Sequence, residues 1–124
     1  MTTQPKQARK QVIVRHESDA PRERSTCGFR YKMLSVQDED AELPAWAHVV
    51  DIDGAREHYH KESTEIYYVL KGEGSLTLDG VDHSMRKGSI AVIPPGVVHG
   101  AKGKMRVIVL GVPHIRDDDL YFPE

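Results

Sequence analysis

Four side chains in two runs of this sequence have the types and the spacing of a metal-binding set. His58, His60 and Glu65 follow one another in the pattern H-x-H-x4-E. If this run is extended, the two histidines share one face, because side chains alternate from face to face along a strand. A second run, from Gly88 to His99, supplies another histidine. Two imidazoles on one face, a carboxylate at the start of the next strand and a distant imidazole could surround a transition-metal ion.

Three imidazoles and one carboxylate suit divalent ions of Fe, Mn, Ni, Cu, Co or Zn. Four protein ligands on an octahedral ion leave two positions for water or substrate. Such an ion can polarise a chelating oxygen, orient two reactants or, if it is redox-active, bind dioxygen. Each histidine taken alone is more simply explained as a surface or packed residue, and only the joint spacing favours a metal. The sequence therefore predicts one divalent transition metal per chain, of unspecified identity, held by His58, His60, Glu65 and His99.

Four further residues are weaker candidates for the pocket beside the metal, and no catalytic residue is assigned. His48 and His83 could each point inward from a strand. Tyr67 has the parity of the glutamate in the first run, which predicts that it faces the same interior, where core packing is its simpler role. Arg56 has the parity of the two histidines in that run and could bind a carboxylate. An exposed position at the strand entrance is the simpler interpretation of Arg56.

Length and composition indicate one globular domain. The chain has 124 residues, of which 39% are hydrophobic and 29% are charged. Its one cysteine, Cys27, excludes an internal disulfide and is expected to be a small apolar side chain near the first strand. No apolar run approaches the roughly 20 residues that cross a bilayer, and residues 1–7 lack the apolar core of a secretory signal. We therefore expect a cytoplasmic protein with no membrane partner.

Charge is distributed unevenly along the chain. Residues 1–30 carry seven Lys or Arg against three Asp or Glu, whereas residues 31–70 carry three against nine. A basic arm beside an acidic body predicts contacts between arm and body, within one subunit or between two. The basic residues are too few, and lack the interleaved aromatic residues, to predict a nucleic-acid partner.

Short runs of β-branched and aromatic residues, separated by turn signals, predict an all-β fold. The predicted strands cover residues 29–33, 46–52, 56–60, 65–70, 75–78, 81–85, 89–93, 97–100 and 105–112, and an edge strand could form at 12–14. Turns are predicted at 53–54, 72–74 and 79–80, and loops at 15–26 and 37–43. No segment shows an apolar period of 3.6 over three turns. The pattern therefore favours an antiparallel sandwich or barrel with almost no helix.

The two runs resemble the two signature motifs of the cupin superfamily, which are small β-barrels of jelly-roll topology. The first motif, G-x5-H-x-H-x3,4-E-x6-G, is matched from His58 to Gly72, although three residues rather than five separate Gly54 from His58. The second motif, G-x5-P-x-G-x2-H-x3-N, is matched at Gly88, Pro94, Gly96 and His99, with Gly103 in place of the asparagine. This asparagine is not a metal ligand in the family, so its loss puts little in doubt.

The resemblance implies a cupin-type jelly-roll barrel (double-stranded β-helix) over residues 27–115. An N-terminal arm, 1–26, precedes this barrel, and an acidic C-terminal tail, 116–124, follows it. The resemblance also implies that the four residues above are the metal ligands. It covers less than half of the chain directly, and it carries almost no information about the reaction.

The family includes dioxygenases, isomerases, decarboxylases and lyases, so several functions stay open. A small barrel implies a small-molecule ligand that chelates the metal through oxygen or nitrogen. No separate general base stands out, which mildly favours dioxygenase-like chemistry over a metal-dependent isomerase or lyase. The alternative is a non-catalytic module that binds or senses a metal or small ligand. A homodimer is expected, because an open barrel edge invites pairing and residues 12–14 could reach a partner's sheet.

Overall fold

The computed structural model describes residues 12–35, 38, 43–113 and 118–124, so most of the loop predicted at 37–43 lies outside the described residues. The described elements are the 3-10 helix η1 (Glu17–Asp19) and the strands β1 (Arg22–Ser25), β2 (Gly28–Leu34), β3 (Trp46–His58), β4 (Thr64–Leu78), β5 (Val81–Arg86), β6 (Ile90–Ile93) and β7 (His99–Val112). The predicted all-β class is confirmed.

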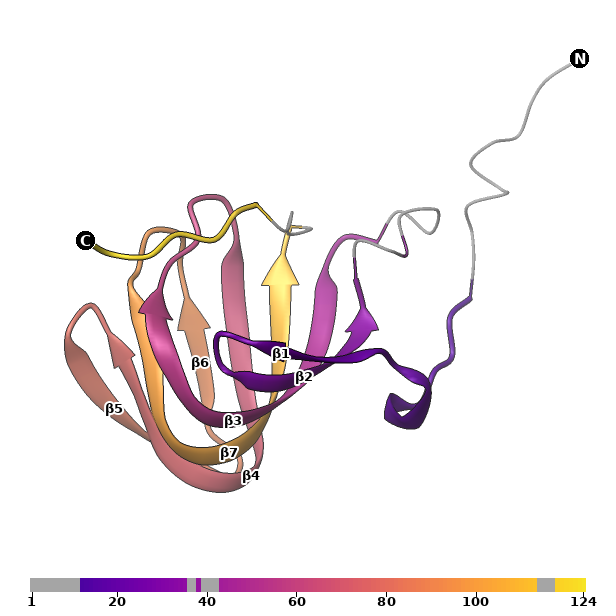
Figure 1. The fold of residues 1–124 in the computed structure, drawn as a ribbon, viewed down its shortest axis with the longest axis horizontal. Helices are drawn as coiled ribbons and strands as arrows, with labels where there is room; N and C mark the ends of the chain where they lie inside the picture. Colours follow the sequence, from indigo (N-terminus) through magenta and orange to yellow (C-terminus); the bar gives the residue numbers. More distant parts are fainter. Residues whose placement is uncertain (1–11, 36–37, 39–42, 114–117) are drawn as a thin grey trace, which may run out of the picture.

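The strands form one antiparallel sheet that closes into a jelly-roll barrel (Figure 1). Its order is β1-β2-β3-β7-β4-β5, and β6 also pairs with β4. One edge of β4 pairs with β7 along its whole length, while its other edge pairs first with β6 and then with β5. The long strands β3, β4 and β7 bend through the barrel, so that distant parts of the chain meet inside it. The run predicted at 105–112 is central, as expected.

Two predicted turns are instead irregular points inside continuous strands. Gly54 lies within β3 and Gly72 within β4, both with φ of +83°. The pairing register shifts close to each of them. Glycine accepts this backbone conformation without steric cost, and a bulge bends a strand where the barrel must curve. Glycine was therefore interpreted correctly as a break in regular structure, but wrongly as a chain reversal.

The prediction of a loop over residues 15–26 is wrong, because η1 and β1 form there. Polar side chains hold β1 against β2: the guanidinium groups of Arg22 and Arg24 lie 3.9 and 4.4 Å from the centre of the Phe29 ring. Between them, Glu23 pairs with Arg30 directly across the two strands. A strand that is stabilised by cross-strand charge and cation–π contacts cannot be predicted from hydrophobic alternation.

Residues 12–14 form no strand in this chain, so the predicted edge strand is wrong within the described residues. Val12 and Val14 are 90% and 93% exposed. Whether they reach a second subunit stays a prediction, as does the homodimer.

The hydrophobic core fills the barrel interior from both sheet halves. Its buried members are Cys27, Trp46, Val50, Ile52, Tyr67, Val69, Leu76, Met85, Ile93, Ala101, Met105, Val107 and Val109. Trp46 occupies the space above Gly111, where an added Cβ would lie 1.9 Å from the indole nitrogen. No helix of the described residues has the length and apolarity needed to span a membrane.

We predict that Gly72→Ala destabilises the protein more than Gly80→Ala. Both glycines have φ of +83°, so alanine costs each about 1–2 kcal/mol of backbone strain. A Cβ on Gly72 would lie 2.4 Å from the carbonyl oxygen of Lys104, whereas one on Gly80 meets nothing within 4 Å. We therefore expect a further loss of about 1–3 kcal/mol for Gly72→Ala, measured by urea denaturation. Equal losses in the two variants would contradict this account.

Candidate metal centre

The structure brings together the four residues that the motif spacing selected. His58 is the last residue of β3 and lies directly opposite His99, the first residue of β7. His60 follows β3 closely, and Glu65 is the second residue of β4. Each residue is at most 9% exposed. One potential ligand atom from each lies within 4.8 Å of all the others, so the cluster is suitable for a metal ion.

Backbone carbonyl groups determine how the three imidazole rings are oriented. The Nδ1 atoms of His58, His60 and His99 lie 2.7, 2.5 and 2.9 Å from the carbonyl oxygens of Arg56, Asp119 and Val97, respectively. A carbonyl oxygen can only accept a hydrogen bond, so each Nδ1 carries the proton. The Nε2 atom of each neutral ring then presents a lone pair. Such partners behind metal-binding histidines set both the tautomer and the ring orientation.

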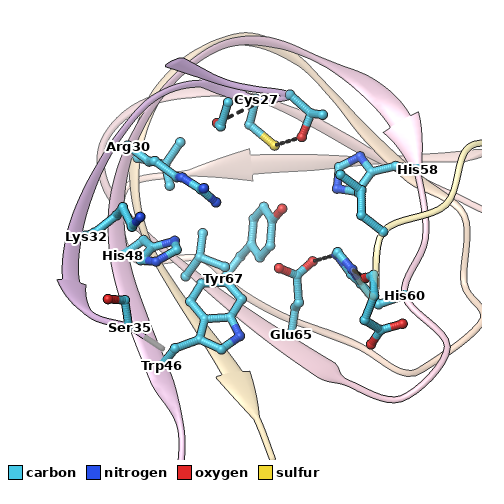
Figure 2. A pocket seen from close by; sticks show the side chains of 16 residues that line it. Cys27, Arg30, Lys32, Ser35, Trp46, His48, His58, His60, Glu65 and Tyr67 are labelled. Atoms are coloured by element: carbon cyan, nitrogen blue, oxygen red, sulfur yellow. Dashed lines mark hydrogen bonds and ion pairs between the residues drawn. The ribbon is translucent and has the colours of Figure 1, made fainter. Parts of the chain in front are cut away.

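Three buried polar atoms at the centre of the cluster lack a hydrogen-bond partner among the described residues. Nε2 of His60 lies 3.1 Å from Oε1 of Glu65 (Figure 2). Nε2 of His99 lies 2.8 Å from the same oxygen. All three atoms are buried, and none forms a well-oriented hydrogen bond. Two lone pairs facing a carboxylate repel one another unless a proton or a metal cation lies between them. The residues present therefore fit a divalent cation.

Burial and the neighbouring charges shift the pKa values of the cluster. Burial alone would raise the pKa of Glu65, but His60 and His99 outweigh it and lower that pKa to about 2. Burial, together with the neighbouring His99, lowers the pKa of His58 to about 4. Burial opposes the protonation of His60, yet the contact with Glu65 raises the pKa of His60 above its usual 6.5. Near neutral pH, Glu65 is therefore ionised and His58 is a neutral potential ligand.

The C-terminal residues complete the cluster from a distant part of the chain. Asp119 is only 3% exposed, and its carbonyl oxygen accepts the hydrogen bond from His60. Its carboxylate accepts hydrogen bonds from the backbone N–H groups of Lys61 (2.8 Å) and Glu62 (3.1 Å). The side chain and backbone of Asp119 thus hold the segment that carries His60. The sequence predicted only an acidic tail here, because no local pattern reports a contact across 59 residues.

A cavity of about 180 Å³ lies between the cluster and β2 (Figure 2). Among the residues that line it are Cys27, Arg30, Lys32, Trp46, His48, Val50, Tyr67 and Val109. This volume is below the roughly 300–1,000 Å³ of drug-sized ligand pockets. The cavity therefore suits a small molecule that reaches the cluster.

Two of the weaker candidates line this cavity. His48 is 8% exposed, and its ring centre lies 4.3 Å from that of Trp46. Burial first, and then the positive charges of Arg30 and Lys32, lower the pKa of His48 to about 4. Tyr67 is 3% exposed, and burial together with Glu65 raises its pKa well above 10. Near neutral pH the cavity thus contains a neutral imidazole and a protonated phenol.

Arg56 does not face the cavity, contrary to the pocket hypothesis. Its guanidinium lies 3.8 Å from the centre of the Phe122 ring on the outside of the barrel. The register shift between Ala55 and His58 breaks the alternation that predicted a shared face. Phe122 is held there because the backbone of Tyr121 pairs with that of Tyr59.

His83 also lies away from the metal cluster. It is exposed on β5, opposite Leu76, and it shares the inward parity of the buried Met85. The prediction that His83 reaches the pocket is nevertheless wrong, because β5 is an edge strand that pairs with the half of β4 remote from Glu65.

Sequence reasoning missed three charged residues of the site: Arg30, Lys32 and Asp119. The two cations alternate within the run correctly predicted as a strand, so their shared face was available as a signal. Alternation alone does not distinguish a cavity-facing pair of cations from a solvated face. Cys27, in contrast, is buried as predicted, and burial raises the pKa of its thiol.

Comparison with known proteins gives one family match and two partial relatives. The family model described as the Cupin domain matches residues 49–113. An uncharacterized protein of Methanocaldococcus jannaschii is 45% identical over 42 residues, covering 34% of each chain. An uncharacterized protein of Aquifex aeolicus is 40% identical over 53 residues, which are 43% of this chain and 44% of that protein. The chain thus matches less than half the length of these two relatives.

Solved structures resemble this chain over most of its length. A protein from Planctomyces limnophilus has a TM-score of 0.83 at 26% identity, covering 92% of this chain and 99% of that one. A variant of Streptomyces PAC13, a nucleoside dehydratase, was solved with uridine and has a TM-score of 0.80 at 16% identity, covering 92% of both chains. Ectoine synthase from P. lautus has a TM-score of 0.73 at 16% identity, covering 89% of this chain and 88% of that one. At these identities the two enzymes show a shared fold alone.

We predict that Asp119→Ala destabilises the protein by about 1–3 kcal/mol, because the N–H groups of Lys61 and Glu62 lose their acceptor. Asp119→Asn keeps one side-chain oxygen and should lose less. Urea denaturation measures the loss, and hydrogen exchange should show faster exchange at both amides. Glu124→Ala, at an exposed position of the same segment, is the control. Unchanged exchange in Asp119→Ala would contradict the assigned role.

Proposed function

Because this chain belongs to the cupin family, we propose that it is a metal-dependent enzyme that acts on a small molecule bound in the cavity. One observation carries the proposal: three imidazole Nε2 atoms converge with the Glu65 carboxylate, and every Nδ1 is engaged by a carbonyl oxygen. The cavity lies directly beside this cluster, and two of the cluster histidines and Glu65 belong to its wall. A ligand in the cavity can therefore reach the open positions of a bound ion.

The donor set accepts Fe, Mn, Co, Ni, Cu or Zn, and the identity of the ion remains open. A bound ion would supply Lewis-acid polarisation of a chelating oxygen or, if redox-active, dioxygen chemistry. The chain itself supplies the oriented imidazoles, one carboxylate and a cavity wall that restricts water.

We predict that the protein binds about one Co²⁺ per chain, measured by absorption spectroscopy and metal analysis. His99→Gln and Glu65→Gln should weaken binding by about 100-fold, since each replaces an imidazole or a carboxylate with a weakly coordinating neutral amide of similar volume. His83→Gln is the matched control, because it changes an exposed histidine outside the cluster. Absence of binding, or equal binding by all variants, would refute the metal site.

For the reaction itself, the geometry best supports metal-assisted acid–base chemistry. The sequence favoured a dioxygenase because no separate base stood out, but the structure adds His48 and Tyr67 to the cavity. With a pKa of about 4, the imidazole of His48 is unprotonated near neutral pH; it is a weak base whose basicity rises when a bound anion offsets the neighbouring positive charges. The phenol of Tyr67 stays protonated and can donate a hydrogen bond. Proton abstraction or elimination on a small chelating substrate is therefore the first candidate reaction.

Dioxygenase-like chemistry is the second candidate, supported by a ligand set that accepts redox-active iron, manganese or copper. A binding or sensing module without turnover is the third. The cytoplasmic location and the homodimer also stay predictions.

We predict that metal-loaded protein in D₂O exchanges the C3 protons of 2-oxobutanoate, followed by NMR. His48→Gln should slow this exchange at least tenfold while keeping metal affinity, whereas the control His83→Gln should not. Oxygen uptake with catechol, thiol or 2-oxo-acid probes, without proton exchange, would instead support the dioxygenase. If these probes show neither proton exchange nor oxygen uptake, the result favours the binding module.

A further inference from the structure

We propose that Arg30 and Lys32 form an anion-binding subsite in the cavity wall that faces the metal cluster, so that the substrate is a small acid. Its carboxylate or phosphate group would bind these two cations, while its other end chelates the metal. The chelation of the metal by the other end of the substrate rests on the proposed function. The subsite itself rests on the position and charge of the two side chains.

The two side chains lie on the inner face of β2. Arg30 is paired with Val50 and Lys32 with His48 on the neighbouring strand, and all four residues line the cavity. Figure 2 shows Arg30, Lys32 and His48 along one wall, opposite His58 and His60. A molecule that spans this cavity contacts cationic groups at one end and potential metal ligands at the other.

The positive charge of the two side chains is only partly neutralised by the protein. Among the described residues, Glu23 is the one carboxylate partner of the two cations. Its Oε1 accepts hydrogen bonds from Nε (2.7 Å) and Nη2 of Arg30, and its Oε2 lies 3.7 Å from Nζ of Lys32. The second distance is too long for a hydrogen bond. The side chain of Lys32 is nevertheless only 13% exposed. Burying an ammonium without hydrogen-bond acceptors is unfavourable, and a bound anion would supply them.

The charge of the whole cavity also favours an anion. Among the described residues that line it, the cations Arg30 and Lys32 balance the carboxylates of Glu65 and Asp119. The Asp119 carboxylate is already engaged by two backbone N–H groups. A divalent ion at the cluster would leave the cavity with a net charge of about +2. A ligand with two negative charges restores neutrality, and one with a single negative charge halves the excess.

A further buried donor lies in the same wall. The indole N–H of Trp46 has no acceptor among the described residues, although the residue is only 7% exposed and lines the cavity. Buried donors are normally satisfied, so an oxygen-rich ligand is a suitable partner. The small cavity volume then limits the ligand to a compact acid.

A purely structural role is the alternative explanation for Arg30 and Lys32. The Arg30–Glu23 pair is partly exposed, so its contribution to the stability of the β1–β2 hairpin is small. That role does not explain why Lys32 lines the cavity with no hydrogen-bond acceptor among the described residues. The two roles also make different predictions for Glu23→Gln. A structural pair predicts only a loss of stability, whereas the subsite predicts tighter anion binding because both cations are freed.

The experiment compares two acids that share a chelating end. Calorimetry on Co²⁺-loaded protein measures the affinities for 2-oxopentanedioate and for 2-oxopentanoate, which lacks the distal carboxylate. We expect the diacid to bind at least about tenfold more tightly. Lys32→Met and Arg30→Met should remove most of this preference, and Glu23→Gln should increase it. The control Lys102→Met removes a lysine that is 72% exposed outside the cavity and should change nothing. A third probe, 2-oxo-3-phosphooxypropanoate, distinguishes phosphate from carboxylate as the preferred group.

A second measurement separates the subsite from the metal site. Inorganic phosphate is titrated into metal-free protein, and the amide resonances of β2 are followed by NMR in the wild type and in Lys32→Met. Saturable shifts that this substitution abolishes support the subsite even if Co²⁺ does not bind, in which case only the proposed function fails. Binding of Co²⁺ with no preference for the diacid, or a preference kept in both methionine variants of correctly folded protein, overturns the subsite and leaves the proposed function intact.

Discussion

Three hydrogen bonds from imidazole Nδ1 atoms to backbone carbonyl oxygens are the constraint on which the site depends. They direct three Nε2 lone pairs toward one another and toward the carboxylate of Glu65. In a buried environment this arrangement is unfavourable without a positive charge at its centre. The protein therefore uses backbone carbonyl groups, one in β3 and two outside the strands, to hold side chains in an orientation that a central cation satisfies.

The barrel brings the four side chains of the cluster together because the ends of its long strands meet. β3 ends and β7 begins at opposing histidines, and β4 begins beside them, so one end of the barrel gathers all four potential ligands. Glycines inside the long strands permit the curvature. The carbonyl oxygen of Asp119 then accepts the hydrogen bond that orients His60. The cluster therefore depends on the C-terminal residues as well as on β3, β4 and β7.

The cavity has two walls of different chemistry. One wall presents the potential metal ligands, and the other presents two cations, a neutral imidazole and an indole donor. Since each wall is suited to oxygen atoms of a ligand, together they favour a compact, oxygen-rich and negatively charged molecule. This complementarity connects the metal proposal with the substrate class inferred from the opposite wall.

The sequence alone determined the β class, most strand positions and the identity of the His/His/Glu/His cluster, because period-two alternation and motif spacing are local signals. Tertiary structure decided which glycines bend a strand and which reverse it, since that depends on a partner backbone. It also decided that His48 reaches the cavity while His83 stays exposed, although each lies on the inward face of its strand. Above all, it decided the contact of Asp119 with His60 and the shared cavity of Arg30, Lys32 and Glu65, which lie on strands that become neighbours of the site only when the barrel closes.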